Sequence, residues 1–299
     1  MQRVIINSFS LLILSLFISA CARPIAAFEF DYKNGKKAPS AIRFDNKSEK
    51  ATAYEWNFGD GKISKDTSPV HSFKHSGTYV VQLTAIDGKK SRIIKKQLTV
   101  EAPEKCLVEI ETNHGTMLVE LSDATPQHRD NFLKLAEQSY FDSLLFHRVI
   151  NGFMVQGGDP NSKNAKPGDQ LGVGGPDYTI PAEFVDSLVH VKGALAAARQ
   201  GDQGNPQKRS SGSQFYIVQG QTVTTAMLDQ LEARKGVRYT QAQRDAYAAN
   251  GGTPFLDRDY TVFGRVIEGL EVLDSIAAVS TDGRDRPTED VKMTVIVIK

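Results

Sequence analysis

The sequence predicts a mainly β protein with two domains, an N-terminal β-sandwich and a closed antiparallel β-barrel with two capping helices and a helical insertion. The first observation behind this fold class is length, because 299 residues leave room for more than one domain. The second is repeated alternation of apolar and polar residues between glycine-containing turns, which is typical of strands. The third is that helical spacing of apolar residues in the two domains is limited to a few segments after Thr125.

Composition excludes several classes of function. The chain is 40% hydrophobic and 24% charged, and its formal net charge of +1 gives no reason to expect a nucleic-acid partner. His114, His128 and His190 have no Cys, Asp or Glu at metal-ligand spacing, and neither a phosphate loop nor a serine-hydrolase motif is present. We therefore expect no metal and no other cofactor.

Residues 1–20 are predicted to be a secretory signal peptide. Arg3 supplies its positive charge, and the apolar stretch that ends at Ile18 is too short for a stable membrane span. Small residues directly before Cys21 resemble a bacterial lipobox. The resemblance implies cleavage before Cys21 and lipidation of this residue, which would anchor the protein to a membrane of the cell envelope. Ordinary signal cleavage beside an incidental cysteine is the alternative.

Residues 21–27 are predicted to be a lipidated tether. Ala22 is not acidic, which by analogy with bacterial lipoproteins favours the outer membrane, facing the periplasm, with exposure at the cell surface left open. A lipidated Cys21 leaves Cys106 without an internal disulfide partner. Cys106 begins an apolar run, so we expect a buried or half-buried thiol.

Residues 28–101 are predicted to be a small β-sandwich, because short alternating stretches are separated by turn residues such as Asn34-Gly35 and Asp87-Gly88. Residues 56–61, 68–73 and 77–85 resemble the PKD domain, an immunoglobulin-like module of extracellular proteins. The only tryptophan, Trp56, could stack on a carbohydrate, but we favour a place in the core between two sheets. The domain would then act as a spacer or contact a protein or glycan.

Residues 102–105 form a short linker that contains Pro103, and residues 106–299 form the second domain. Alternation over Leu107–Leu121 around a turn at 113–115 predicts a hairpin. Thr125 can cap a helix that Pro126 begins, and a second helix is expected around 270–279. Many short strands with two helices suit a closed barrel, which removes exposed sheet edges.

The run 146–159, FHRVINGFMVQGGD, is the most informative part of this domain. Because side chains alternate along a strand, Arg148, Met154 and Gln156 share a face if the turn at Asn151-Gly152 preserves the register. A cation and an amide beside apolar side chains could bind a small apolar group next to a carbonyl, such as proline in a peptide. A barrel strand with a surface arginine is the alternative.

The same run resembles the signature of the cyclophilins, the peptidyl-prolyl cis–trans isomerases inhibited by cyclosporin. Residues 193–199, 212–217, 255–257 and 260–264 resemble further cyclophilin motifs, in the family's order. The resemblance covers about residues 106–299. It implies eight antiparallel strands closed into a barrel and capped by two helices. It also implies isomerase activity on unfolded or flexible proline-containing polypeptides, with no cofactor.

The resemblance also implies roles for individual residues. Arg148 would donate a hydrogen bond to the prolyl nitrogen, while Gln156 and the backbone of Arg199 would hold the substrate carbonyl. Gln214 would support the arginine or line the groove, and Phe215 should point into the core. The expected walls of the proline pocket are Phe153, Met154, Tyr216, Leu256 and Tyr260, with Phe255 beside them.

Four features depart from the usual cyclophilin pattern. Tyr216 replaces a phenylalanine, so we expect a hydroxyl in the pocket, and Tyr260 replaces a frequent histidine. Phe255 replaces the tryptophan of many cyclosporin-sensitive members, which predicts poor inhibition by the drug. Residues of about 220–254 form a helical insertion, either a flap or platform near the groove or a packed surface excursion.

Taken together, the motifs predict a lipid-anchored peptidyl-prolyl cis–trans isomerase that assists the folding of exported proteins. Its isomerase residues would be Arg148 and Gln156. The alternative is a non-catalytic lipoprotein that binds proline-containing peptides or mediates surface interactions. Retention of Arg148, Phe153, Met154 and Gln156 favours the enzyme.

Overall fold

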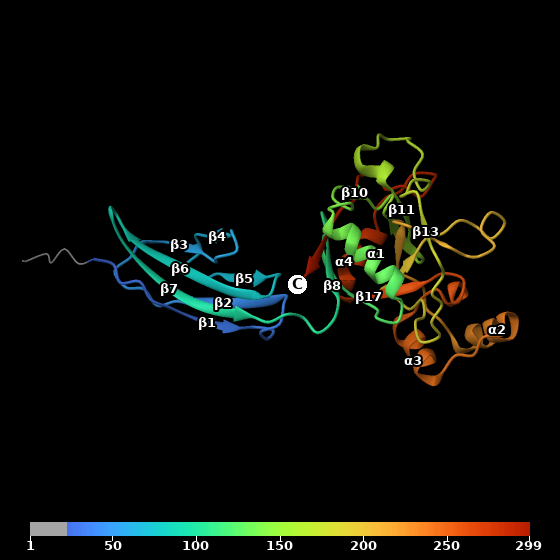
Figure 1. Cartoon of the computed structure of the whole chain (residues 1–299), viewed down its shortest axis with the longest axis horizontal. Coiled ribbons are helices and arrows are strands. Elements are labelled where there is room, and N and C mark those ends of the chain that lie inside the picture. Colours follow the sequence, from blue (N-terminus) through green and yellow to red (C-terminus); the bar gives the residue numbers. More distant parts are fainter. Residues whose placement is uncertain (1–22) are drawn as a thin grey trace, which may run out of the picture. The chain divides into compact units, whose positions relative to one another are not determined.

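The computed structural model describes residues 23–299, so the predicted signal peptide and Cys21 lie outside the described residues. The Cα positions divide these residues into two units (Figure 1). Residues 23–36, 40–73 and 77–100 form the first, and residues 37–39, 74–76 and 101–299 form the second. Within residues 23–299, no helix is both long enough and apolar enough to cross a membrane.

The first unit contains two antiparallel sheets, one of three strands in the order β1-β2-β5 and one of four in the order β4-β3-β6-β7. The strand bounds are β1 Phe28–Tyr32, β2 Ser40–Asn46, β3 Ala53–Asn57, β4 Ile63–Ser64, β5 Val70–Phe73, β6 Gly77–Asp87 and β7 Lys90–Val100. Apolar residues alternate along these strands, so each sheet can bury one face. The predicted β-sandwich is therefore present.

Trp56 lies in the core of this sandwich. Its side chain is fully buried. Its ring packs against Phe28 and Phe44 of the opposite sheet, with ring centroids 5.1 and 5.5 Å away. The indole Nε1 donates a hydrogen bond to the Asp66 carbonyl at 2.9 Å, which satisfies its one polar group. The expected core position is confirmed, and carbohydrate stacking on Trp56 is wrong because the ring has no exposed face.

The second unit is built on one antiparallel sheet of nine strands in the order β10-β18-β8-β9-β17-β14-β16-β12-β11, with a separate β13-β15 pair. The strand bounds are β8 Leu107–Thr112, β9 Gly115–Leu121, β10 Leu144–Leu145, β11 Arg148–Ile150, β12 Met154–Gly157, β13 Thr179–Ile180, β14 Ala194–Ala197, β15 Ser210–Ser211, β16 Phe215–Val218, β17 Val262–Glu268 and β18 Lys292–Ile298. The predicted hairpin is β8-β9.

The prediction of a closed eight-stranded barrel is not confirmed, because the nine-stranded sheet is curled but open. Its edge strands, β10 and β11, are consecutive in the chain and separated only by Phe146 and His147. These two edge strands are not paired with each other. The backbone around this break is instead bonded to a neighbouring loop, with Phe146 N–H donating to Val291 and Val149 N–H donating to Asp285.

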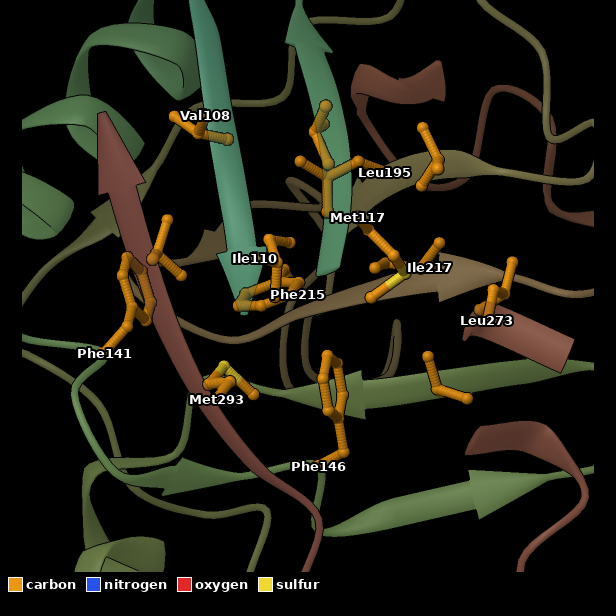
Figure 2. Packing of buried hydrophobic residues seen from close by; sticks show 14 of the residues in the cluster. Val108, Ile110, Met117, Phe141, Phe146, Leu195, Phe215, Ile217, Leu273 and Met293 are labelled. Carbon is orange, nitrogen blue, oxygen red and sulfur yellow. The ribbon is translucent and has the colours of Figure 1, made fainter. Parts of the chain in front are cut away.

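A hydrophobic core fills the concave side of this sheet. It combines alternate residues of the strands with apolar residues of two helices (Figure 2). Those labelled in the figure are Val108, Ile110, Met117, Phe141, Phe146, Leu195, Phe215, Ile217, Leu273 and Met293. Cys106 is half-buried against the same core, as expected.

Two helices cover the core, α1 from Pro126 to Glu137 and α4 from Leu270 to Ala277, close to the predicted ranges. The prediction that Thr125 caps α1 with its side chain is wrong, because its hydroxyl donates to the Ser122 carbonyl. The Glu183 carboxylate takes that place. It accepts hydrogen bonds from the backbone N–H groups of Gln127 and His128 at 3.1 and 3.0 Å. A carboxylate suits the positive end of a helix dipole.

The insertion contains α2 from Thr225 to Lys235 and α3 from Gln241 to Asn250, and two 3-10 helices, η1 Pro160–Asn164 and η2 Pro254–Leu256, lie in other loops. In Figure 1, α2 and α3 lie together, apart from α1 and α4. Gln221 and Gly252 exchange backbone hydrogen bonds where the insertion leaves and rejoins the domain. Gly252 has φ +150°, and a Cβ there would lie 2.3 Å from the His190 carbonyl, so only glycine fits this junction.

Candidate active site

Three neighbouring strands place Arg148, Gln156 and Tyr216 in one row across the sheet. Arg148 of β11 pairs with Gln156 of β12, which pairs with Tyr216 of β16. Residues directly opposite each other in antiparallel strands point to the same face. Met154 lies two residues before Gln156 and shares this face. The prediction that the 151–152 turn preserves the register of Arg148, Met154 and Gln156 is confirmed.

The turn itself explains why the register holds. Phe153 N–H donates to the Ile150 carbonyl at 3.0 Å, and Gly152 sits at the third position of the turn with φ +76°. A tight turn of this kind needs positive φ at that position, which glycine adopts without strain. Asn151-Gly152 therefore joins β11 to β12 and leaves the facing pairs in place.

The face that carries this row bears an apolar cluster on the side of the sheet opposite the core, and we refer to this cluster as the hollow. Phe215 points into the core, as expected, and its neighbour Tyr216 points into the hollow. The buried members of the hollow are Met154, Ala194, Ala196, Ala198, Tyr216, Val218 and Val262, and the partly buried ones are Ile150, Phe153, Leu188, Leu256 and Tyr260.

Two aromatic pairs form walls of the hollow. Phe153 stacks on Phe255 with centroids 5.8 Å apart, and Tyr216 meets Tyr260 edge-on at 5.8 Å. Phe255 is 47% exposed and stands at the rim, whereas Tyr216 is 4% exposed. All five residues expected to form the walls belong to this one cluster, with Phe255 beside it.

Arg148 stands at the open side of the hollow, with 44% of its side chain exposed. Its Nε donates to Asp285 Oδ2 at 3.4 Å, a long contact with a carboxylate that is itself exposed. The Asp285 carbonyl also accepts a hydrogen bond from Val149 N–H at 2.8 Å. No local sequence pattern points to Asp285, which lies 137 residues from Arg148 and reaches it only through the fold.

The amide of Gln156 is held by a second amide. Gln156 Nε2 donates to Gln214 Oε1 at 3.1 Å, and Gln214 Nε2 donates to the Gly174 carbonyl at 2.7 Å. A glutamine amide has two N–H donors, so one N–H of Gln156 is used here and the second can point to a ligand. Of its two expected positions, Gln214 therefore occupies the groove lining and supports Gln156.

A groove of about 570 Å³ adjoins this amide pair. Its wall includes Gln156, Arg199, Gln214 and the glycine-rich loop at 172–175. Asp159 fixes that loop, because its Oδ2 accepts backbone hydrogen bonds from Gly172, Val173 and Gly174. No residue of the 220–254 insertion lines the groove, which does not support the flap alternative.

The side chain of Arg199 braces the pocket and does not point into it. Its guanidinium lies over the Tyr260 ring, 4.5 Å from the centroid, and its Nε donates to the Asp259 carbonyl at 2.6 Å. A further ion pair joins it to Asp202 at 2.6 Å. Only the backbone of Arg199 remains for a substrate, which is the part the family resemblance implicates.

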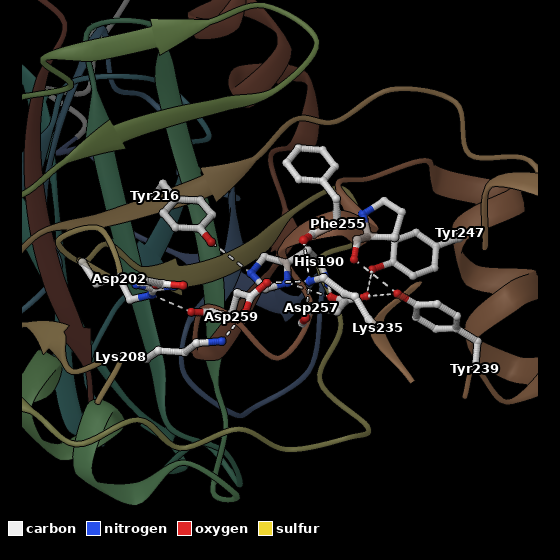
Figure 3. Close-up of polar contacts among 12 residues, drawn as sticks. His190, Asp202, Lys208, Tyr216, Lys235, Tyr239, Tyr247, Phe255, Asp257 and Asp259 are labelled. Atoms are coloured by element: carbon white, nitrogen blue, oxygen red, sulfur yellow. Dashed lines mark hydrogen bonds and ion pairs between the residues drawn. The ribbon is translucent and has the colours of Figure 1, made fainter. Parts of the chain in front are cut away.

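The expectation that Tyr216 adds a hydroxyl to the pocket is wrong. The hydroxyl turns toward His190 and lies 3.0 Å from its Nε2, while the ring forms the wall (Figure 3). Burial raises the pKa of Tyr216 well above its ordinary value, so the hydroxyl keeps its proton. The pocket surface at this position is therefore that of a phenyl ring.

Two other histidines have structural environments. Burial lowers the pKa of His147 to about 4, so the ring beside Arg148 in the chain is neutral and faces inward. His128 Nδ1 contacts Glu183 at 2.7 Å and its Nε2 contacts Ser210 at 2.9 Å, but Ser210 is buried and cannot reach a substrate. Among residues 23–299, no group of three or more His, Cys, Asp or Glu side chains is arranged to hold a metal.

Comparison with known proteins assigns both units to families. The model of the cyclophilin-type peptidyl-prolyl cis–trans isomerases matches residues 107–297. The model of the PKD domain matches residues 21–101. These ranges cover the two stretches in which the sequence motifs were found.

Several bacterial proteins are similar to the second unit. A Streptococcus pyogenes protein, provisionally named a bifunctional phosphatase/peptidyl-prolyl cis–trans isomerase, is 40% identical over 208 residues. The match covers 68% of this chain but only 40% of that protein. A Staphylococcus haemolyticus protein, provisionally named a peptidyl-prolyl cis–trans isomerase, is 37% identical over 196 residues, which cover 64% of this chain and 90% of that one.

Among solved structures, a cyclophilin-type isomerase of Cryptosporidium parvum is similar, with a TM-score of 0.47 and 24% identity. The match covers 65% of this chain and 98% of that one.

Proposed function

The chain belongs to the cyclophilin-type peptidyl-prolyl cis–trans isomerase family, and we propose that its row of Arg148, Gln156 and Tyr216 performs the rotation of X-Pro bonds. The enzyme is a peptidyl-prolyl isomerase with an N-terminal PKD domain.

The reaction needs no bond to be cleaved. Rotation about the X-Pro bond breaks amide resonance, and the barrier of roughly 20 kcal/mol makes the unaided step take tens to hundreds of seconds. An enzyme accelerates it by binding the twisted amide more tightly than either planar isomer. The site therefore needs a group whose interaction strengthens in the twisted state and a wall that holds one end of the bond.

Arg148 supplies the first requirement. In the twisted state the prolyl nitrogen becomes pyramidal, and its lone pair can accept a hydrogen bond. A guanidinium stays protonated and carries five N–H donors in a rigid fork, and Asp285 engages only the Nε side of that fork. The terminal nitrogens of Arg148 can then donate to the prolyl nitrogen when its lone pair appears.

The hollow supplies the second requirement. Met154, Tyr216 and Tyr260 belong to one apolar cluster that would contact the proline ring. Phe153 and Leu256 complete the walls, and Phe255 extends them at the rim. The second N–H of Gln156 and the Arg199 backbone hold a carbonyl of the substrate, with Gln214 fixing the Gln156 amide.

The observation that carries this proposal is the register in which Arg148, Gln156 and Tyr216 face one another across three strands. We expect the full-length chain in mild detergent to accelerate isomerisation of a short Ala-Pro peptide. Arg148→Ala should lower kcat/KM by about two orders of magnitude, since loss of one transition-state donor commonly costs that much. A folded parent without acceleration, or an unimpaired variant, would contradict the proposal.

The competing function is a non-catalytic lipoprotein that captures proline-containing peptides or mediates surface interactions. Retention of Arg148 together with Phe153, Met154 and Gln156 favours the enzyme, because the arginine adds a donor for the twisted amide to the apolar and amide groups that would suffice for capture. Such a binding protein would bind the Ala-Pro peptide without changing its rate of isomerisation. Calorimetric titration beside the rate assay distinguishes the two functions.

We propose further that the protein acts in the bacterial cell envelope, as a lipoprotein anchored through Cys21, on exported chains with exposed X-Pro bonds. The signal-like residues 1–20 and the lipobox-like end before Cys21 support this place. The outer membrane, facing the periplasm, is favoured, and the PKD domain would contact proteins there. Metabolic labelling with a fatty acid should mark the parent and spare Cys21→Ala, and equal labelling would contradict the anchor.

A further inference from the structure

The insertion contributes two tyrosine hydroxyls to a buried carboxylate outside the proline hollow. Tyr239, which follows α2, and Tyr247 of α3 both donate to Asp257 Oδ2, at 2.9 and 2.6 Å (Figure 3). Burial raises the pKa of both tyrosines, so both hydroxyls keep the protons they donate. One carboxylate oxygen is thus fully engaged by the insertion.

The other oxygen of Asp257 is engaged by His190. Asp257 Oδ1 accepts hydrogen bonds from the backbone N–H of His190 at 2.9 Å and from its ring Nδ1 at 2.7 Å. The side chains of His190 and Asp257 are 1% and 6% exposed. A buried carboxylate needs such partners on both oxygens, and this one receives two donors on each.

His190 connects Asp257 to Tyr216 in the proline hollow. The Asp257 carboxylate can only accept, so His190 Nδ1 faces it as the donor, and the opposite ring nitrogen, Nε2, lies 3.0 Å from the Tyr216 hydroxyl. The two rings also lie almost parallel, with an interplanar angle of 15° and centroids 6.0 Å apart. The Tyr216 ring, which forms a wall of the hollow, is therefore fixed at its far end.

Lys235, the last residue of α2, fixes the other wall. Its Nζ donates to the carbonyls of Phe255 and Asp257 at 2.6 and 3.0 Å and pairs with Asp259 at 2.6 Å. These atoms belong to the stretch that carries Phe255, Leu256 and Tyr260. Both walls thus depend on side chains of an insertion that does not line the groove.

We propose that Tyr239 and Tyr247 of the insertion are positioning residues of the proline pocket, acting on Tyr216 through Asp257 and His190. This inference rests on the proposed function, because it assigns the hollow to the proline ring. The insertion then works neither as a flap over the substrate nor as an inert excursion. The insertion supports the Tyr216 ring from the side away from the substrate, and the affinity for proline depends on this support.

A wall that holds the ring acts alike on the planar and twisted states. Its loosening should weaken binding without slowing the bound substrate, so KM rises and kcat stays unchanged. For Tyr239→Phe/Tyr247→Phe we expect KM and the peptide Kd to rise about fivefold, with kcat within about twofold of the parent. The phenyl rings preserve packing, so the variant should fold.

The matched control is Arg244→Gln. Arg244 joins α3 to α2 through ion pairs with Asp229 and Glu232 at 2.8 and 2.9 Å and touches neither Asp257 nor His190. The substitution removes these ion pairs within the insertion but leaves the hydroxyls of Tyr239 and Tyr247 in place. We expect a lower Tm with an unchanged KM. Equal increases in KM for the control and the tyrosine variant, at similar loss of Tm, would overturn the inference.

A double-mutant cycle with Tyr216→Phe tests the route. Without the Tyr216 hydroxyl, His190 no longer holds the ring. In this background, Tyr239→Phe/Tyr247→Phe should have less than about half of its effect on peptide Kd. Additive effects, or no change in Kd for Tyr239→Phe/Tyr247→Phe, would overturn the inference. Peptide Kd is measurable without turnover. A parent that binds the peptide but does not isomerise it would contradict the proposed function, and the Kd values of the variants would still test the positioning role.

Discussion

The two sides of the proline hollow are built differently. On one side Arg148 is 44% exposed and has one ion pair of 3.4 Å with an exposed carboxylate. On the other, Tyr216, His190 and Asp257 are almost fully buried and linked by hydrogen bonds of 2.7 to 3.0 Å. The loose side holds the charged donor, and the rigid side holds the apolar wall.

This contrast follows the demands of the reaction. The donor must reach a nitrogen whose lone pair appears only when the amide twists, so a firm ground-state partner would compete with it. The wall must hold the proline ring still while the preceding carbonyl swings past. A buried network with every donor and acceptor satisfied is rigid, because each group loses a partner if it moves.

The largest effect should come from removing the centre of the rigid side. Asp257→Ala leaves two tyrosine hydroxyls and two donors of His190 without their acceptor. We expect the free energy of unfolding to fall by on the order of 3 to 5 kcal/mol, as for loss of one partner from a buried charged group. Urea unfolding of the parent and variant measures it. A loss no larger than that of Arg148→Ala would mean that the two sides are equally loose.

The second prediction concerns the pH dependence of stability, which tests whether strand β11 beside Arg148 is well packed. His147 neighbours Arg148, and burial lowers its pKa to about 4. The unfolded chain binds a proton at this ring below its ordinary pKa of about 6.5, whereas the folded chain does so only near 4. As pH falls through this window, the folded state should therefore lose stability, by roughly 3 kcal/mol from this group.

His147→Gln should flatten that part of the pH dependence. Urea unfolding at about pH 7 and about pH 4.5, for parent and variant, measures the difference. Equal slopes would mean that His147 titrates normally in the folded protein. The exposure of Arg148 would then reflect a loose β11 and not its own position on a well-packed strand.

The smallest effect should come from the one ion pair on the loose side. Asp285→Asn removes the charge that faces Arg148 Nε but keeps the backbone carbonyl that binds Val149. Exposed ion pairs contribute about 0 to 1 kcal/mol, so the equilibrium constant of unfolding and kcat should each change by less than about fivefold. A large drop in kcat would show that Asp285 holds Arg148 firmly.

The loose side was predictable from sequence, and the rigid side was not. Arg148, Met154 and Gln156 lie within nine residues, so alternation and one turn suffice to place them on one face. The inward position of Phe215 follows from the same alternation. Local rules likewise predicted the helices of the insertion and the helix that begins at Pro126.

The rigid side depends on contacts between distant residues. His190 and Asp257 are 67 positions apart, and Tyr239 reaches Asp257 only because the insertion folds back on the domain. No spacing rule connects them, so the direction of the Tyr216 hydroxyl was mistaken. The prediction of the N-terminal cap of α1 was wrong for the same reason, since Glu183 reaches Gln127 across 56 positions. The open sheet depends on the break at 146–147, which has no local signal.

The separation of kcat from KM in Arg148→Ala tests the contrast between the two sides. We expect kcat for the Ala-Pro peptide to fall by about two orders of magnitude while KM stays within about threefold, because the donor acts only on the twisted amide. Steady-state rates over a range of peptide concentrations give both constants. A KM that rises while kcat is preserved would place Arg148 in ground-state binding and contradict its role as the transition-state donor.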